Sequence, residues 1–264
     1  MIGVFDSGLG GLTALKELSD LLPEEGFLYL ADTAHLPYGK KTSGDICRFS
    51  ARAVSFLTDM GADSVLLACG TASSLAFDFC KRYFTCELYE VIEPSVLAAV
   101  RATKSRRIGV AATEATVKSG IFPRLFQRYA PDCLVCEAGC PSLVTLSEHG
   151  ECADTHSYDA VRKSLAPFLC DKVDTLILGC THFALLSPYI HALLPSVTLI
   201  ESGKEGARAL FDNTQSGKAG ARKHLKGAGA LRIFTTGDAE RLSVRASFLL
   251  QRRVRAEKIN QDII

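Results

Sequence analysis

Hydrophobic and polar positions follow two alternating patterns along the chain. Short apolar runs are separated by longer stretches in which apolar residues recur every three or four positions. The first pattern is typical of buried strands and the second of amphipathic helices. We predict strands at residues 2–5, 27–30, 64–68, 108–111, 134–137, 175–178, 197–200 and 231–234, and helices at residues 12–22, 45–60, 72–82, 95–101, 154–169, 183–194, 204–211 and 240–250. This alternation predicts an α/β fold with largely parallel sheets.

The pattern nearly repeats in the second half of the chain. Residues 2–4 and 108–110 both read Ile-Gly-Val, and in each half a cysteine, Cys69 or Cys180, closes an apolar run just before a helix-like stretch. Such a repeat predicts two similar lobes, each a mostly parallel sheet flanked by helices, with the active site between them. Because a strand and a helix follow residue 202, we expect a discontinuous first lobe, residues 1–93 plus 205–264, and a second lobe at 94–204.

Composition and charge narrow the choice of function. The net charge is only +1, so we expect no nucleic-acid partner. The chain enters its first strand without a charged leader or a long apolar span, so we expect a cytoplasmic protein that does not contact membranes. The ten cysteines should then be mostly free thiols. Cys133 and Cys136 form a single CxxC pair with no second pair to complete a zinc site, so we expect no metal.

The two cysteine turns are the strongest chemical signal. A thiolate is a useful base, and a position at a helix start or beside another acid/base group favours it over the thiol. His182 could assist Cys180, and Asp6, at the end of the first strand, could approach Cys69. Racemisation is the simplest chemistry that needs acid/base groups on both faces of one carbon. We therefore expect Cys69 and Cys180 to face each other across one cleft, with their sulfurs roughly 6–9 Å apart. The alternative is that each cysteine is a small buried hydrophobe.

Other polar turns allow more than one interpretation. Gly8 and Gly10 fit part of a dinucleotide-binding fingerprint, although Thr13 stands where its third glycine belongs, so a nucleotide-binding protein remains an alternative. The hydroxyl of Thr113 could bind a carboxylate or cap a helix. Glu148 follows a helix-like run, where a solvated helix end is the plainer interpretation.

Four segments taken together resemble a known family. Residues 5–11, 31–33 with 37–39, 68–73 and 178–183 resemble, in order and over nearly the whole chain, the glutamate racemases of bacterial cell-wall synthesis. The resemblance implies interconversion of L- and D-glutamate without a cofactor, supplying D-glutamate for peptidoglycan. It makes Cys69 and Cys180 the proton-transfer groups, assisted by Asp6 and His182. The matching substrate-binding residues are Ser7, Pro37, Tyr38, Gly39, Gly70, Thr71, Thr113, Thr116, Glu148 and Thr181.

The chain departs from the family pattern at one central position. Gly70 stands where the family has asparagine, so an amide donor for the substrate is missing, and we expect Gly70→Asn to improve turnover of glutamate. Lesser departures are His35, Ala184 and Glu201, where arginine, proline and aspartate are usual. Two alternatives therefore remain. One is a racemase for aspartate or another acidic amino acid, and the other is a catalytically weak relative with a binding or regulatory role. A homodimer is compatible with the sequence, which does not fix the oligomeric state.

Overall fold

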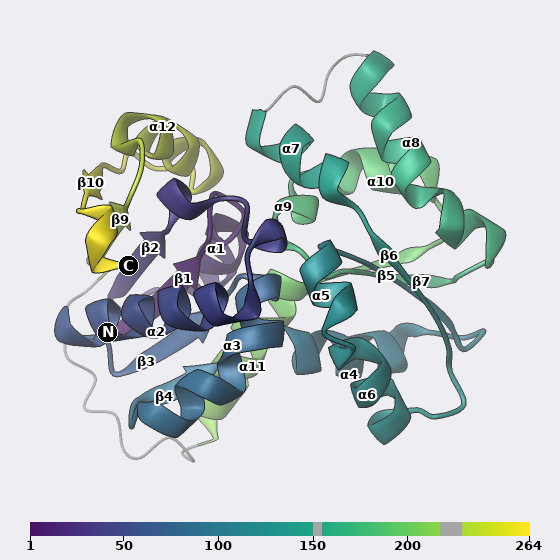
Figure 1. Cartoon of the computed structure of the whole chain (residues 1–264), viewed down its shortest axis with the longest axis horizontal. Helices are drawn as coiled ribbons and strands as arrows, with labels where there is room; N and C mark the ends of the chain where they lie inside the picture. The colour runs from purple at the N-terminus through teal and green to yellow at the C-terminus, as the bar shows by residue number, and fades with distance from the viewer. Residues whose placement is uncertain (150–154, 217–228) are drawn as a thin grey trace.

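The structure, a computed structural model, contains two parallel sheets (Figure 1). It describes residues 1–149, 155–216 and 229–264. The larger sheet has the strand order β10-β9-β2-β1-β3-β4 and the smaller one β6-β5-β7-β8, and neighbouring strands pair in parallel in both sheets. The strands are β1 Ile2–Asp6, β2 Phe27–Ala31, β3 Ser64–Leu67, β4 Glu87–Tyr89, β5 Arg107–Ala112, β6 Leu134–Gly139, β7 Thr175–Leu178, β8 Thr198–Glu201, β9 Leu231–Thr235 and β10 Ala256–Lys258. The predicted fold class is therefore confirmed.

Helices connect successive strands and cover the sheets, as parallel pairing requires. They are α1 Leu12–Leu21, α2 Ser43–Asp59, α3 Gly70–Tyr83, α4 Ile92–Ala102, α5 Glu114–Lys118, α6 Ile121–Tyr129, α7 Pro141–His149, α8 Thr155–Cys170, α9 Thr181–Ala184, α10 Ser187–Leu193, α11 Ser202–Gln215 and α12 Ala239–Leu249, with short 3₁₀ turns at Thr33–His35, Tyr38–Lys40 and Gln261–Ile263. The predicted helix at 183–194 is two helices, because Pro188 occupies the first turn of α10 and starts a new helix there. Asp154, where another predicted helix begins, lies outside the described residues.

Successive residues of the central strands supply different apolar layers. Val4 of β1 packs in one cluster with Leu12 and Leu15 of α1, whereas its neighbour Phe5 packs in another with Val54 and Leu57 of α2. Strands buried on both faces read as continuous apolar runs, which explains why the sequence pattern identifies them. β4 and β10 escape that pattern because they are short edge strands whose residues are mostly half-buried or exposed.

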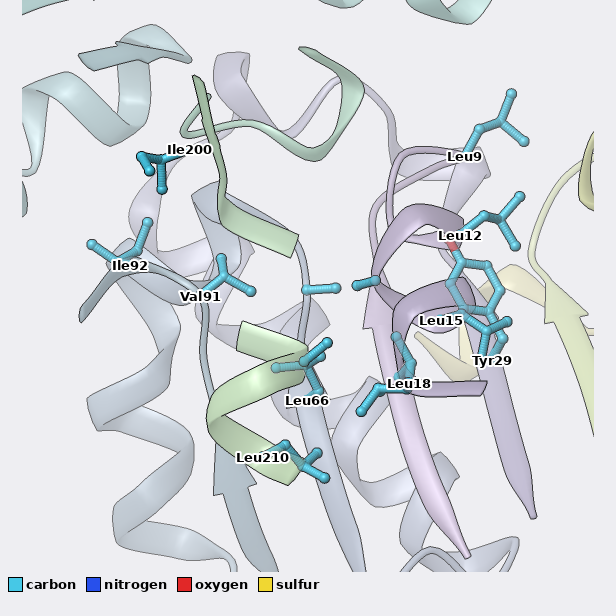
Figure 2. Packing of buried hydrophobic residues seen from close by; sticks show 14 of the residues in the cluster. Leu9, Leu12, Leu15, Leu18, Tyr29, Leu66, Val91, Ile92, Ile200 and Leu210 are labelled. Carbon is cyan, nitrogen blue, oxygen red and sulfur yellow. The ribbon is translucent and has the colours of Figure 1, made fainter. Parts of the chain in front are cut away.

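One apolar cluster joins the two lobes. Figure 2 shows Leu12 of α1 and Leu66 of β3, which belong to the lobe of the larger sheet, in the same cluster as Ile92 of α4 and Ile200 of β8. The cluster continues into the smaller sheet through Val110 of β5. The two lobes therefore share one core. Burying each of its large apolar side chains contributes about 1.5–3 kcal/mol to the stability of the fold. The larger sheet draws its strands from residues 2–89 and 231–258 and the smaller one from 107–201.

Candidate active site

The first cysteine turn lies where β1 and β3 end side by side. Phe5 and Leu67 are register partners, so Asp6 and Cys69 emerge from the same edge of the sheet. Cys69 directly precedes α3 and is only 4% exposed, and its sulfur lies 3.4 Å from the Ser7 hydroxyl oxygen. The buried Asp6 carboxylate accepts hydrogen bonds from the Gly8 amide at 2.8 Å and from the Thr181 hydroxyl at 2.9 Å. Asp6 therefore links the first turn to the second.

The second cysteine turn carries a chain of acid/base groups. Cys180 directly precedes α9, and its sulfur lies 3.7 Å from Nδ1 of His182. The other ring nitrogen of His182 forms a hydrogen bond with Glu148 on α7. The Ser147 hydroxyl donates a 2.8 Å hydrogen bond to the His182 carbonyl oxygen, which fixes the backbone of the turn. Glu148 is therefore a partner of the buried imidazole rather than a solvated helix end, so the plainer interpretation of that residue was wrong.

Hydroxyl groups from both lobes meet beside the thiols. The Thr71 and Thr113 hydroxyl oxygens are 2.9 Å apart, and Thr113 also lies 3.0 Å from the Thr116 hydroxyl. Thr113 caps α5 as well, because its side chain accepts a hydrogen bond from the Thr116 amide. The Tyr38 hydroxyl donates a 2.6 Å hydrogen bond to buried Asp32, which orients the ring. These side chains form a polar wall between the lobes.

A cavity of about 290 Å³ connects these groups. Such a volume lies at the small end of ligand pockets, which hold roughly 300–1,000 Å³, and favours a small metabolite. Both cysteines line this one cavity, one from each lobe. The predicted site residues that line it are Ser7, Pro37, Tyr38, Gly39, Cys69, Thr71, Thr113, Cys180 and His182. The predicted sulfur separation stays a prediction.

Five predicted residues stand outside that lining. Thr116 and Glu148 bond to the lining residues Thr113 and His182. Asp6 and Thr181 bond to each other behind the lining, and Gly70 packs against the second cysteine turn. The lining also contains residues that the sequence did not reveal. These are Leu36, Lys40, Glu114, Pro141, Ser142, Val144 and Thr145. Leu36 and Lys40 flank the predicted residues 37–39, whereas the α7 residues carried no motif that could have identified them.

Burial and neighbouring charges set the protonation of the site. Burial, reinforced by the Asp6 charge, raises the pKa of Cys69 to about 12, and burial also raises the pKa of Asp6. Burial opposes the charged form of His182, but its bonds to Cys180 and Glu148 outweigh this and raise its pKa well above the ordinary value. Burial likewise disfavours the charged form of Glu148, yet the hydrogen bond from His182 lowers its pKa overall. These shifts favour the thiol form of Cys69 and an imidazolium–carboxylate pair of His182 and Glu148 beside Cys180.

Three glycines pack closely against the second lobe or its cysteine turn. A Cβ added at Gly10 would lie 2.5 Å from the His182 backbone nitrogen, and one at Gly8 would lie 2.7 Å from a Glu148 oxygen. Close packing of the second lobe therefore explains both glycines without a nucleotide. A Cβ added at Gly70 would lie 2.1 Å from the Gly179 carbonyl oxygen. The structure therefore has no room for the side chain of Gly70→Asn, which contradicts the steric premise of the expected gain in turnover.

Comparison with known proteins places the chain in a family. A sequence profile of the Asp/Glu/Hydantoin racemase family matches residues 14–210. The chain belongs to this family. A glutamate racemase of Symbiobacterium thermophilum is 38% identical to this racemase-family chain over 242 residues, which cover 91% of the chain and 87% of the relative.

Solved structures of family members superimpose over the whole chain. The glutamate racemase RacE1 of Bacillus anthracis has a TM-score of 0.91 at 30% identity and covers 98% of this chain and 97% of its own. A glutamate racemase of Francisella tularensis, solved with D-glutamate, has a TM-score of 0.88 at 28% identity, with 100% and 98% coverage. Within the described residues, the helices are too short or too polar to span a membrane.

Proposed function

We propose that this racemase-family chain is a glutamate racemase that works without a cofactor through two cysteine bases. The observation that carries the proposal is that Cys69 and Cys180 line one small cavity from opposite lobes. Each thiol has its own supporting groups, with Ser7 and Asp6 near Cys69 and His182 with Glu148 near Cys180. The glutamate racemases that resemble the chain over most of their length support glutamate as the substrate.

In the proposed reaction one sulfur removes the α-proton and the other returns a proton to the opposite face. The electron pair left on the α-carbon delocalises into the substrate carboxylate, which hydroxyl donors such as Thr71 and Thr113 can stabilise. In this direction Cys69, whose pKa burial raises to about 12, is the proton donor. Cys180, whose sulfur lies 3.7 Å from Nδ1 of His182, takes the role of the base.

The opposite direction uses the same groups with their protons exchanged. Cys69 must then become a thiolate. The proposed acceptor of its proton is the buried Asp6 carboxyl, because its raised pKa brings its proton affinity closer to that of a thiol. After each turnover the thiol and the thiolate have changed places. The pair returns to its starting state when the protons exchange with solvent.

The remaining biological assignments are proposals of the same kind. D-Glutamate would supply peptidoglycan synthesis in the cytoplasm. The lobe boundaries, 1–93 plus 205–264 and 94–204, and a homodimer also stay predictions. Sedimentation would test the homodimer.

A racemase for aspartate or another acidic amino acid is the second candidate, because hydroxyl donors that bind the α-carboxylate do not select for the length of the substrate side chain. Comparing glutamate with aspartate in the same assay decides between them.

The deciding experiment follows the α-proton of each glutamate enantiomer in heavy water. We expect the unmodified chain to exchange the proton and invert the centre. Cys69→Ser and Cys180→Ser should each abolish racemisation, because a hydroxyl is a far poorer base at neutral pH. Each variant should still exchange the α-proton, or eliminate from an analogue with a leaving group, for one enantiomer only, and the two variants should differ in which one.

Cys170→Ser is the matched control, because Cys170 is exposed and lies outside the cavity lining. Parental racemisation in Cys180→Ser would contradict the assignment of the second base. Binding of glutamate without exchange by the unmodified chain would instead favour the catalytically weak relative.

A further inference from the structure

The second cysteine turn, residues 179–182, rests against glycines of the first lobe. Gly70 is the first residue of α3, and a Cβ there would lie 2.1 Å from the Gly179 carbonyl oxygen and 3.1 Å from its carbonyl carbon. Separations under about 3 Å between such atoms are repulsive, and the atoms that would be met belong to backbone. The two lobes can approach this closely only because residue 70 has no side chain.

Gly10 makes an equivalent contact elsewhere on the same turn. An added Cβ there would lie 2.5 Å from both the Thr181 hydroxyl oxygen and the His182 backbone nitrogen. Thr181 also donates its hydrogen bond to Asp6, next to the glycine turn. The hydrogen bond therefore holds residues 179–182 against the first lobe, and the absence of a side chain at Gly10 allows the close approach.

The turn has little room to move away from this contact. The Gly179 amide donates a 2.8 Å hydrogen bond to the Ala111 carbonyl. A Cβ added at Gly179 would lie 3.2 Å from the Ala111 oxygen and 3.3 Å from the Phe122 ring, so the space behind this residue is already filled. A side chain at residue 70 would therefore displace one lobe relative to the other rather than be absorbed locally.

We propose that Gly70 is a positioning residue that sets the separation of the two cysteine sulfurs. It adjoins Cys69 in the chain, and the carbonyl it contacts belongs to the residue before Cys180. In this chain the backbone of the two turns is already in contact at this point, so an added side chain would push the turns apart. This inference rests on the proposed two-base function, because only a reaction that uses both sulfurs at once depends on their separation.

The reaction offers a readout that is specific for this role. Racemisation needs both sulfurs in reach of one carbon, whereas exchange of the α-proton with retention needs only one. Misplacement by about 1 Å can cost a hundredfold in rate. For Gly70→Ala we expect racemisation to fall tenfold to a hundredfold. Exchange with retention, measured in heavy water for each enantiomer, should stay within about threefold of the parent for at least one enantiomer, as expected when only inter-sulfur geometry changes.

Gly44→Ala is the matched control. Gly44 lies in the first turn of α2, and its added Cβ would meet nothing closer than the Thr42 hydroxyl at 3.9 Å. It should keep parental racemisation. Gly10→Ala is the second test variant, and we expect the same selective loss. Circular dichroism and thermal melting establish that each variant is folded.

Several results would overturn the inference. These are parental racemisation in Gly70→Ala, and a folded Gly70→Ala in which exchange and racemisation fall by the same factor. If neither Gly70→Ala nor Gly10→Ala folds, the contact is required for the fold rather than for the spacing of the thiols. This result also overturns the inference. Failure of the proposed function is distinct, because the unmodified chain would then neither exchange nor racemise glutamate.

Discussion

At the scale of single residues, the two thiols occupy unlike environments. Burial and the nearby Asp6 carboxylate disfavour the thiolate of Cys69, whereas Cys180 lies beside an imidazole whose pKa is raised by its bonds to Cys180 and Glu148. A two-base enzyme needs one proton donor and one acceptor at the start of each turnover, and this asymmetry supplies them. The sequence indicated both cysteines and both neighbours, but the environments depend on burial and on Glu148, which approaches from α7.

Glu148→Gln tests this asymmetry through the pH dependence. Loss of the carboxylate removes a cause of the raised His182 pKa, so the imidazole should lose its proton at lower pH. We expect the alkaline limb of the kcat/KM profile to move to lower pH. The pair also stabilises the folded chain, fully between the unfolded pKa of Glu148, about 4.3, and that of His182, about 6.5. This stabilisation fades as the pH rises through the raised folded pKa of His182.

The measurements are pH–rate profiles and denaturant unfolding at several pH values. Glu17→Gln is the control, because Glu17 pairs with Arg208 away from the cavity. An unchanged alkaline limb in a folded Glu148→Gln variant would show that Glu148 does not govern the His182 proton.

At the scale of elements, the site is built where strands end. Asp6, Cys69, Thr113 and Cys180 each lie at or just beyond the carboxyl end of a strand, which is why apolar runs followed by polar turns indicated the site. The sequence could not show which turns approach one another, because that depends on strand order. It also missed the α7 side of the cavity, because Pro141 and Thr145 belong to a helix with no distinctive motif.

Tyr29 on β2 supports the turn that contains Gly8 and Gly10. Nothing in the sequence indicated this role. Its buried hydroxyl donates a 2.7 Å hydrogen bond to the Gly8 carbonyl oxygen. Tyr29→Phe should leave that buried acceptor unpaired and lower the free energy of unfolding by about 1–3 kcal/mol. Urea unfolding measures this loss. Tyr83→Phe is the control and should change stability little, because Tyr83 is 70% exposed. Equal stabilities of the two variants would contradict a supporting role for the Tyr29 hydroxyl.

At the scale of the whole molecule, the C-terminal segment returns to the first lobe and contacts the second. Figure 1 shows α12 beside β9 and β10, with both chain ends on the side of the larger sheet. Arg241 in the first turn of α12 donates a hydrogen bond to the Glu148 carbonyl oxygen, and its guanidinium lies 4.0 Å from a Glu148 carboxylate oxygen. Glu148 in turn bonds to His182, which lies beside Cys180. Arg241 is therefore connected to the second thiol through Glu148 and His182.

Arg241→Gln separates positioning from stability. The Arg241 side chain is 50% exposed, and exposed ion pairs contribute only about 0–1 kcal/mol, so the melting temperature should stay nearly unchanged. We expect kcat/KM to fall several-fold, because Glu148 loses a group that fixes its orientation toward His182. Arg241→Lys should recover part of the loss. Arg232→Gln is the control, because its pair with Glu257 lies outside the cavity lining. If Arg241→Gln and Arg232→Gln have the same kcat/KM as the parent, the contact between α12 and α7 has no part in catalysis.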